Sequence, residues 1–125
     1  MGLFKMLIYE VNLEVEEDIN YKVAGWLTEH LQKMPTFKGF KVAYWFFRKA
    51  EDEDSKVTNK TLWTIQYVVE DRPSLDAYLS EQAPQMRKEG IERFGEKMHI
   101  TRRILNLLNI MGLPSELEQL QSTKG

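Results

Sequence analysis

Two side chains could support acid–base or anion chemistry in this chain, His30 and Arg87. His30 follows Trp26 by about one helical turn on the shoulder of an apolar stripe. An imidazole there could act as a general acid or base near neutral pH. The alternative is structural: a hydrogen bond to a tyrosine across the interface between helix and sheet. We favour the structural role unless a pocket lies beside His30.

Arg87 follows Pro84 in a segment where a proline restarts the helix. Its guanidinium could bind an anionic substrate through two parallel hydrogen bonds. It could equally pair with Glu81, with Glu89 or with a strand carboxylate. The aromatic residues, Trp26 and Tyr78 among them, usually belong to a core, but a pocket lined by them would suit a flat apolar ligand.

Several classes of chemistry lack the residues that they need. The chain has no cysteine, which excludes disulfides, thiolate nucleophiles and cysteine-bound metals. Its two histidines have no third ligand at a metal-binding spacing, so we expect no metal site. There is also no glycine-rich phosphate loop, no serine elbow and no positive support for haem ligation. We therefore expect no cofactor.

The overall charge and hydropathy point to a protein that works without nucleic acid or membrane. The 125 residues carry a net charge of −2, whereas proteins dominated by phosphate contacts are basic. No apolar run reaches the roughly 18 residues of a membrane span. The N-terminal residues also lack a cleavage site of small residues. The expected location is the cytoplasm.

Apolar periodicity predicts six elements in the order βαββαβ. Alternating patterns predict strands at residues 5–15 and 61–70. An aromatic-rich, β-prone composition predicts a strand at residues 39–49, and the last strand is expected at residues 97–108. A 3.6-residue period predicts helices over residues 18–34 and from about residue 71 to Phe94, the second kinked or split at Pro84. This order predicts an α+β, ferredoxin-like sandwich with strand order 4-1-3-2 and two helices on one face. Residues 1–110 would form this domain, and residues 111–125 a tail that is a short helical turn or disordered.

The first strand should be central, and its polar side should meet polar residues of its neighbours. Glu10 and Asn12 would lie beside Gln66 and beside one arginine of the adjacent pair Arg102 and Arg103. Adjacent strand residues point to opposite faces, so only one arginine can lie there, and the pattern does not say which. The polar side also carries apolar residues, more than is usual for a solvated face. We infer that a second copy of the chain covers it through Glu10, Asn12, Gln66 and whichever of Arg102 and Arg103 lies there; the alternative is an open face wet by solvent.

Five short motifs occur in an order that resembles a known family. They are LIYEVNL near the start, Trp26 to His30, Ala83-Pro84 with Arg87, Phe94-Gly95, and Arg102 to Leu105. Over residues 5–108 the chain resembles small bacterial proteins grouped as a domain of unknown function, which look like members of the dimeric α/β-barrel superfamily. The resemblance implies two ferredoxin-like sheets packed face to face. The superfamily includes cofactor-independent monooxygenases, isomerases, lyases, haem enzymes and proteins that only bind. Relatives often carry histidine before the Ala-Pro step, where this chain has Gln82.

Two functional hypotheses follow. In the first, the protein is a homodimeric small-molecule-binding or cofactor-independent enzyme-like protein with a pocket between helices and sheet. His30 would shuttle a proton, Arg87 would anchor an anion, and Trp26 and Tyr78 would line the walls around a small apolar or anionic ligand. In the second, the protein is a non-enzymatic dimeric structural or interaction module. An apolar cavity of a few hundred Å³ beside His30 would favour the first hypothesis.

Overall fold

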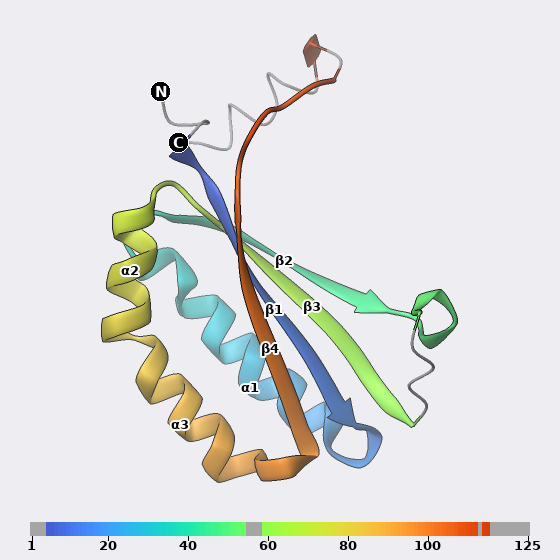
Figure 1. The fold of residues 1–125 in the computed structure, drawn as a ribbon. Helices are drawn as coiled ribbons and strands as arrows, with labels where there is room; N and C mark the ends of the chain where they lie inside the picture. The colour runs from blue at the N-terminus through green and yellow to red at the C-terminus, as the bar shows by residue number, and fades with distance from the viewer. Residues whose placement is uncertain (1–4, 55–58, 113, 116–125) are drawn as a thin grey trace.

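The fold is a four-stranded antiparallel sheet with its helices gathered on one side, as Figure 1 shows. The computed structural model describes residues 5–54, 59–112 and 114–115. The predicted ferredoxin-like order is confirmed, with strands arranged β2-β3-β1-β4. The main elements are β1 (Leu7–Glu16), α1 (Asn20–Lys33), β2 (Phe40–Arg48), β3 (Lys60–Val69), α2 (Arg72–Glu81), α3 (Ala83–Phe94) and β4 (Met98–Asn106).

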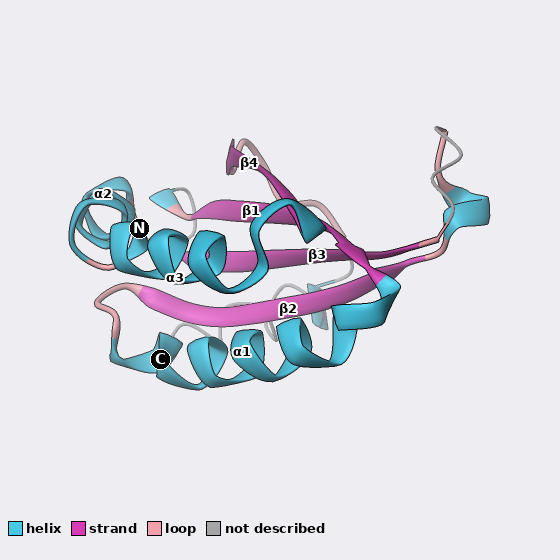
Figure 2. Cartoon of the chain, turned by 90° about the horizontal axis from the view of Figure 1, so that it is seen from below, coloured by secondary structure: helices cyan, strands magenta, loops and turns pink. Residues whose placement is uncertain are grey.

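The second predicted helix is split in two at the proline. Helix α2 ends at Glu81 and α3 begins at Ala83, with Pro84 in the first turn of α3. A proline is tolerated there because the first N–H groups of a helix have no partner within it. Helix α2 begins where the Asp71 side chain accepts a hydrogen bond from the backbone N–H of Ser74, at 2.9 Å. Figure 2 shows α2 and α3 following one another along one side of the strands.

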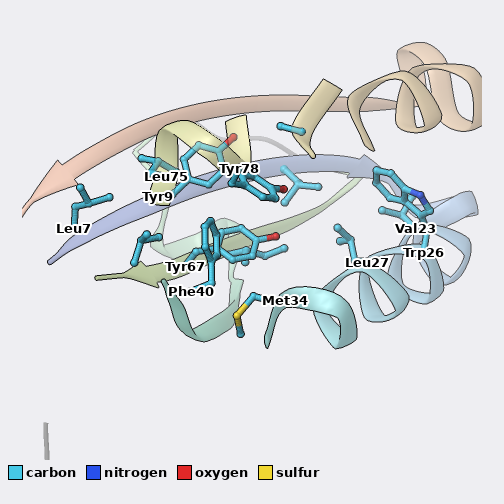
Figure 3. Packing of buried hydrophobic residues seen from close by; sticks show 14 of the residues in the cluster. Leu7, Tyr9, Val23, Trp26, Leu27, Met34, Phe40, Tyr67, Leu75 and Tyr78 are labelled. Carbon is cyan, nitrogen blue, oxygen red and sulfur yellow. The ribbon is translucent and has the colours of Figure 1, made fainter. Parts of the chain in front are cut away.

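The hydrophobic core lies between the sheet and the helices. Alternate residues of β1 and β3 point into it, so that Tyr9 lies opposite Tyr67 and Val11 opposite Ile65. Figure 3 shows aromatic rings from the sheet and from α2 packed together there. The aromatic cluster is Tyr9, Phe37, Phe40, Tyr67 and Tyr78, with neighbouring ring centroids between 4.9 and 6.5 Å apart.

The chain continues beyond the sheet after β4. Within this stretch Leu108 is 91% exposed and Met111 is 85% exposed. The tail predicted at residues 111–125 falls mainly on residues 113 and 116–125, which lie outside the described residues.

Candidate functional site

A cavity of about 250 Å³ lies between the sheet and helix α3. Apolar side chains from the middle of β1 and β3 form its floor, and Trp26 and Leu27 of α1 close one side. Helix α3 and strand β4 close the rest. The complete lining is Tyr9, Val11, Leu13, Trp26, Leu27, Ile65, Tyr67, Tyr78, Ala83, Met86, Arg87, Gly90, Ile91, Gly95, Met98, Ile100 and Arg102. A concave, mainly apolar site with a few polar groups is typical of small-molecule binding.

Three tyrosines bring hydroxyl groups to this apolar space. Tyr9 and Tyr67 come from adjacent strands, with ring centroids 5.8 Å apart, and Tyr78 comes from α2, 6.1 Å from Tyr9. Burial raises the pKa of Tyr67, and the neighbouring tyrosines raise it further, while Arg102 lowers it. Burial likewise raises the pKa of Tyr78, and Tyr9 adds to this effect. The hydroxyls of Tyr67 and Tyr78 are therefore protonated at neutral pH.

Two arginines from different elements line the same cavity. Arg87 of α3 donates from Nη2 to the Tyr9 hydroxyl, at 3.2 Å. Arg102 comes from β4, where it lies opposite Val11. Within the described part of the chain, Arg87 forms no ion pair with Glu81, with Glu89 or with a strand carboxylate, the partners considered from the sequence. Both side chains belong to exposed residues, so the guanidinium groups stand at the rim of the cavity.

His30 lies behind the cavity wall instead of in it. Its Nε2 atom is 3.1 Å from the hydroxyl oxygen of Tyr78, 48 residues away in the sequence. This contact matches the tyrosine hydrogen bond of the structural alternative. His30 itself lines a second, more polar groove of about 370 Å³ between α1 and α3. Trp26 and Met86 line both spaces and separate them.

The environment of His30 keeps its imidazole neutral. Burial lowers the pKa of His30 from 6.5 to about 4, and the charge of Lys33 lowers it too, against an opposite effect of Glu89. Glu89 also accepts a hydrogen bond from the Trp26 indole N–H, at 3.4 Å. A neutral imidazole has one donor and one acceptor nitrogen, so His30 can accept the Tyr78 proton.

The arginine pair is divided between the two faces of the sheet. Arg103 lies opposite Glu10 on the face away from the helices, whereas Arg102 lies on the helix face. Arg103 donates from Nε to Glu10 Oε2 at 2.5 Å. Arg102 therefore does not share the face on which a dimer interface was predicted, and it belongs with the cavity. Because successive strand residues alternate, the two arginines must point to opposite faces of the sheet. The register between β1 and β4 decides which of them faces the helices.

On the open face, Glu10 is held by a small polar network. Gln66 and Asn12 donate to its two oxygens at 2.9 and 3.0 Å, in addition to Arg103. Thr64 in turn donates to the Asn12 side chain at 2.6 Å. Burial raises the pKa of Glu10, but the hydrogen bonds from Arg103, Asn12 and Gln66 outweigh it and leave this pKa below its ordinary value. Glu10 is only 3% exposed although it lies on the open side of the sheet.

Apolar residues surround this network. Tyr44 and Phe46 of β2 stack on one another with a centroid separation of 6.2 Å, and they are 44% and 45% exposed. Leu105 of β4, opposite Ile8, is 37% exposed. An apolar patch around a satisfied polar centre is typical of a contact surface.

The sequence analysis missed part of the cavity lining. Strand alternation puts Tyr9 and Tyr67 on the same face of the sheet, but the pattern alone does not distinguish core residues from cavity residues. Met86 belonged to the apolar stripe expected of the second helix, which does not distinguish a cavity wall from a core, and Gly90 carried no signal. A Cβ atom at Gly90 would lie 3.0 Å from Trp26 and 3.2 Å from Met98, which shows how closely α3 approaches α1 and β4 at that point.

Two further features are absent from the part of the chain that the structure describes. In residues 5–54, 59–112 and 114–115, no group of three or more His, Cys, Asp or Glu side chains could hold a metal ion. Across the same ranges, no helix is long and apolar enough to cross a membrane.

The family of the chain is shown by sequence. The model of a domain of unknown function, DUF4286, matches residues 6–108. The chain belongs to this family. No curated protein matches it.

The DUF4286 domain is similar in fold to several solved structures. A protein from Nitrosomonas europaea with the provisional name of antibiotic biosynthesis monooxygenase has a TM-score of 0.64 at 12% identity, covering 90% of this chain and 99% of its own. SnoaB, a cofactor-independent oxygenase from Streptomyces nogalater, has a TM-score of 0.59 at 10% identity, covering 86% and 97%. A conserved protein of unknown function from Bacteroides thetaiotaomicron has a TM-score of 0.59 at 16% identity, covering 83% and 99%. At these identities the likeness establishes the fold alone.

Proposed function

We propose that this DUF4286 protein is a homodimer that binds a small, mainly apolar molecule in the cavity beside α3 and acts on it without a resident cofactor. The observation that carries the proposal is the cavity itself. Its apolar walls meet three tyrosine hydroxyls and two arginines within one space of about 250 Å³. Its volume suits a ligand of one or two rings, since it lies near the lower end of ligand pockets, which hold roughly 300 to 1,000 Å³.

The roles of the predicted site residues differ in detail from the sequence hypothesis. Trp26 and Tyr78 are walls of the cavity, and Arg87 stands at its rim. His30 would act on a ligand only through Tyr78, because Tyr78 lines the cavity, whereas His30 contacts the Tyr78 hydroxyl and is not part of the lining. A proton leaving the ligand could pass to the Tyr78 oxygen while the Tyr78 proton passes to His30 Nε2. The oxygenase name of SnoaB supports chemistry that needs no cofactor.

Binding can be tested by NMR with a set of small aromatic compounds added to ¹⁵N-labelled protein. We expect shift changes centred on the cavity residues Val11, Met86 and Ile100. Val11→Phe fills the cavity and should abolish them, whereas the matched variant Val11→Ala enlarges it and should retain them. Shift changes that persist in a folded Val11→Phe protein would refute binding in this cavity.

The homodimer would form through the open face of the sheet. Support comes from the exposed Tyr44, Phe46 and Leu105 around the network of Glu10 and Arg103. A covering subunit would remove Arg103 from water and strengthen its pairing with Glu10, since screening by solvent weakens an exposed pair.

Sedimentation at micromolar concentration tests this assembly. We expect twice the chain mass for the wild type and the monomer mass for Leu105→Lys, which places a charge on the open face. Tyr21→Lys is the matched control, because Tyr21 is 68% exposed on α1. A monomeric wild type would refute the dimer. A dimer that binds no compound would instead favour the non-enzymatic module.

A further inference from the structure

The hydroxyls of Tyr9 and Tyr78 differ in their hydrogen bonds within the protein: that of Tyr9 accepts one, whereas that of Tyr78 donates one. The Tyr9 oxygen accepts a hydrogen bond from Arg87 Nη2 at 3.2 Å. A guanidinium can only donate, so the Tyr9 proton is not used in this contact. Tyr9 can therefore donate its own proton into the cavity.

Tyr78 has the opposite arrangement. Its hydroxyl lies 3.1 Å from His30 Nε2 and 3.8 Å from Met86 Sδ. An imidazole nitrogen is a much stronger acceptor than a thioether sulfur, and the buried imidazole is neutral at pH 7. The Tyr78 proton is thus directed to His30, which selects the tautomer protonated on Nδ1. The lone pairs of the Tyr78 oxygen stay available to a ligand.

A donor and an acceptor therefore stand on adjacent rings, whose centroids are 6.1 Å apart. We propose that the polar end of the cavity takes an aromatic alcohol, whose hydroxyl donates to Tyr78 and accepts from Tyr9, and that His30 is the positioning residue that makes Tyr78 an acceptor. This inference rests on the proposed binding function of the cavity. It also deepens that function, because a carboxylate or an ether has no proton to give to Tyr78.

The test compares 2-naphthol with 2-methoxynaphthalene, which has the same rings but no donor. Dissociation constants for both are measured by calorimetry with the wild type, Tyr78→Phe, His30→Leu and His30→Gln. The readout is the ratio of the two constants within each protein, so the effect of the extra methyl group cancels between proteins.

We expect Tyr78→Phe and His30→Leu to reduce the preference for 2-naphthol by about tenfold, the worth of one net hydrogen bond in an apolar site. Without His30, the Tyr78 hydroxyl can turn and donate to either ligand. His30→Gln should keep the preference, because its amide oxygen can accept the Tyr78 proton. If His30 had only a structural role, its replacement would weaken the binding of both ligands equally and leave the ratio of their dissociation constants unchanged.

Two results would overturn the inference, and they can be told apart. If the ratio of the two dissociation constants is the same in all four proteins, the cavity binds aromatic molecules, but His30 does not make Tyr78 a hydrogen-bond acceptor for the ligand. If neither compound binds the wild type and no shift changes appear at Val11 for any aromatic compound, the proposed function fails as well. If His30→Leu does not fold, Tyr78→Phe decides the matter, because a ratio unchanged from the wild type in that variant would overturn the inference.

Discussion

His30→Gln should change the pH dependence of stability in a direction that follows from burial. The pKa of His30 is 6.5 in an unfolded chain and about 4 in the fold. Between these values the unfolded chain binds more protons than the folded one, so His30 destabilises the fold as the pH falls from about 6.5 to about 4. Glutamine can replace the hydrogen bond to Tyr78 but cannot titrate.

The magnitude follows from the two pKa values. Linkage between about pH 7.5 and about pH 5 gives a loss of roughly 2 kcal/mol for the wild type. Because the ring is only partly buried, we expect about 1 to 2 kcal/mol. The wild type should therefore lose this much stability relative to His30→Gln when the pH is lowered.

Urea unfolding followed by tryptophan fluorescence at the two pH values measures this difference. Protein concentration is held constant, since a dimer unfolds in a concentration-dependent way. His99→Gln is the matched control, because it removes the other histidine of the chain, which is exposed on β4. Parallel pH curves for the wild type and His30→Gln would refute the claim that the fold holds His30 neutral.

Three further changes test the fold and the open face. Gly39→Ala should destabilise by about 2 kcal/mol or more in thermal unfolding, because Gly39 has φ +83° and a Cβ would lie 2.2 Å from Ser74 Oγ; an unchanged melting temperature would contradict this. Asp71→Ala should cost about 1 kcal/mol in urea unfolding by removing the cap of α2, while Asp71→Asn should recover most of the loss. Arg103→Met should raise the pKa of Glu10 in a carboxyl NMR titration, because burial is then opposed only by neutral donors; the reasoning fails if the pKa stays where it was.

The arrangement of elements could be predicted because it depends on local patterns. Two-residue alternation located β1 and β3, aromatic β-prone composition located β2, and the 3.6-residue period located α1. Pro84 was expected to kink or split the second helix, since a proline interrupts backbone hydrogen bonding regardless of its surroundings, and the structure shows the split. Strand boundaries differ by one or two residues from those predicted, as is normal where strand ends lose their partners.

The candidate site could be predicted only in part. Trp26, Tyr78 and Arg87 were chosen by residue type, and all three line the cavity. His30 was a candidate on the same grounds, but it lies behind Tyr78. Residue type indicates which chemistry a side chain can support, and only packing decides whether a ligand can reach it.

The arginine pair separates what the sequence determines from what the tertiary structure decides. Adjacency in a strand required that Arg102 and Arg103 point to opposite faces, because successive side chains alternate. The sequence by itself did not determine which one faces the helices. That choice depends on the register between β1 and β4, which pairs Glu10 with Arg103 and Val11 with Arg102.

The contacts that define the site also depend on the tertiary structure. Arg87 reaches Tyr9 across 78 residues, and His30 reaches Tyr78 across 48. No local pattern encodes such pairs, because each depends on how two elements pack after the chain has folded. The sequence determined the elements, their order and the residue types able to do chemistry; the tertiary structure alone decided which of them share the cavity.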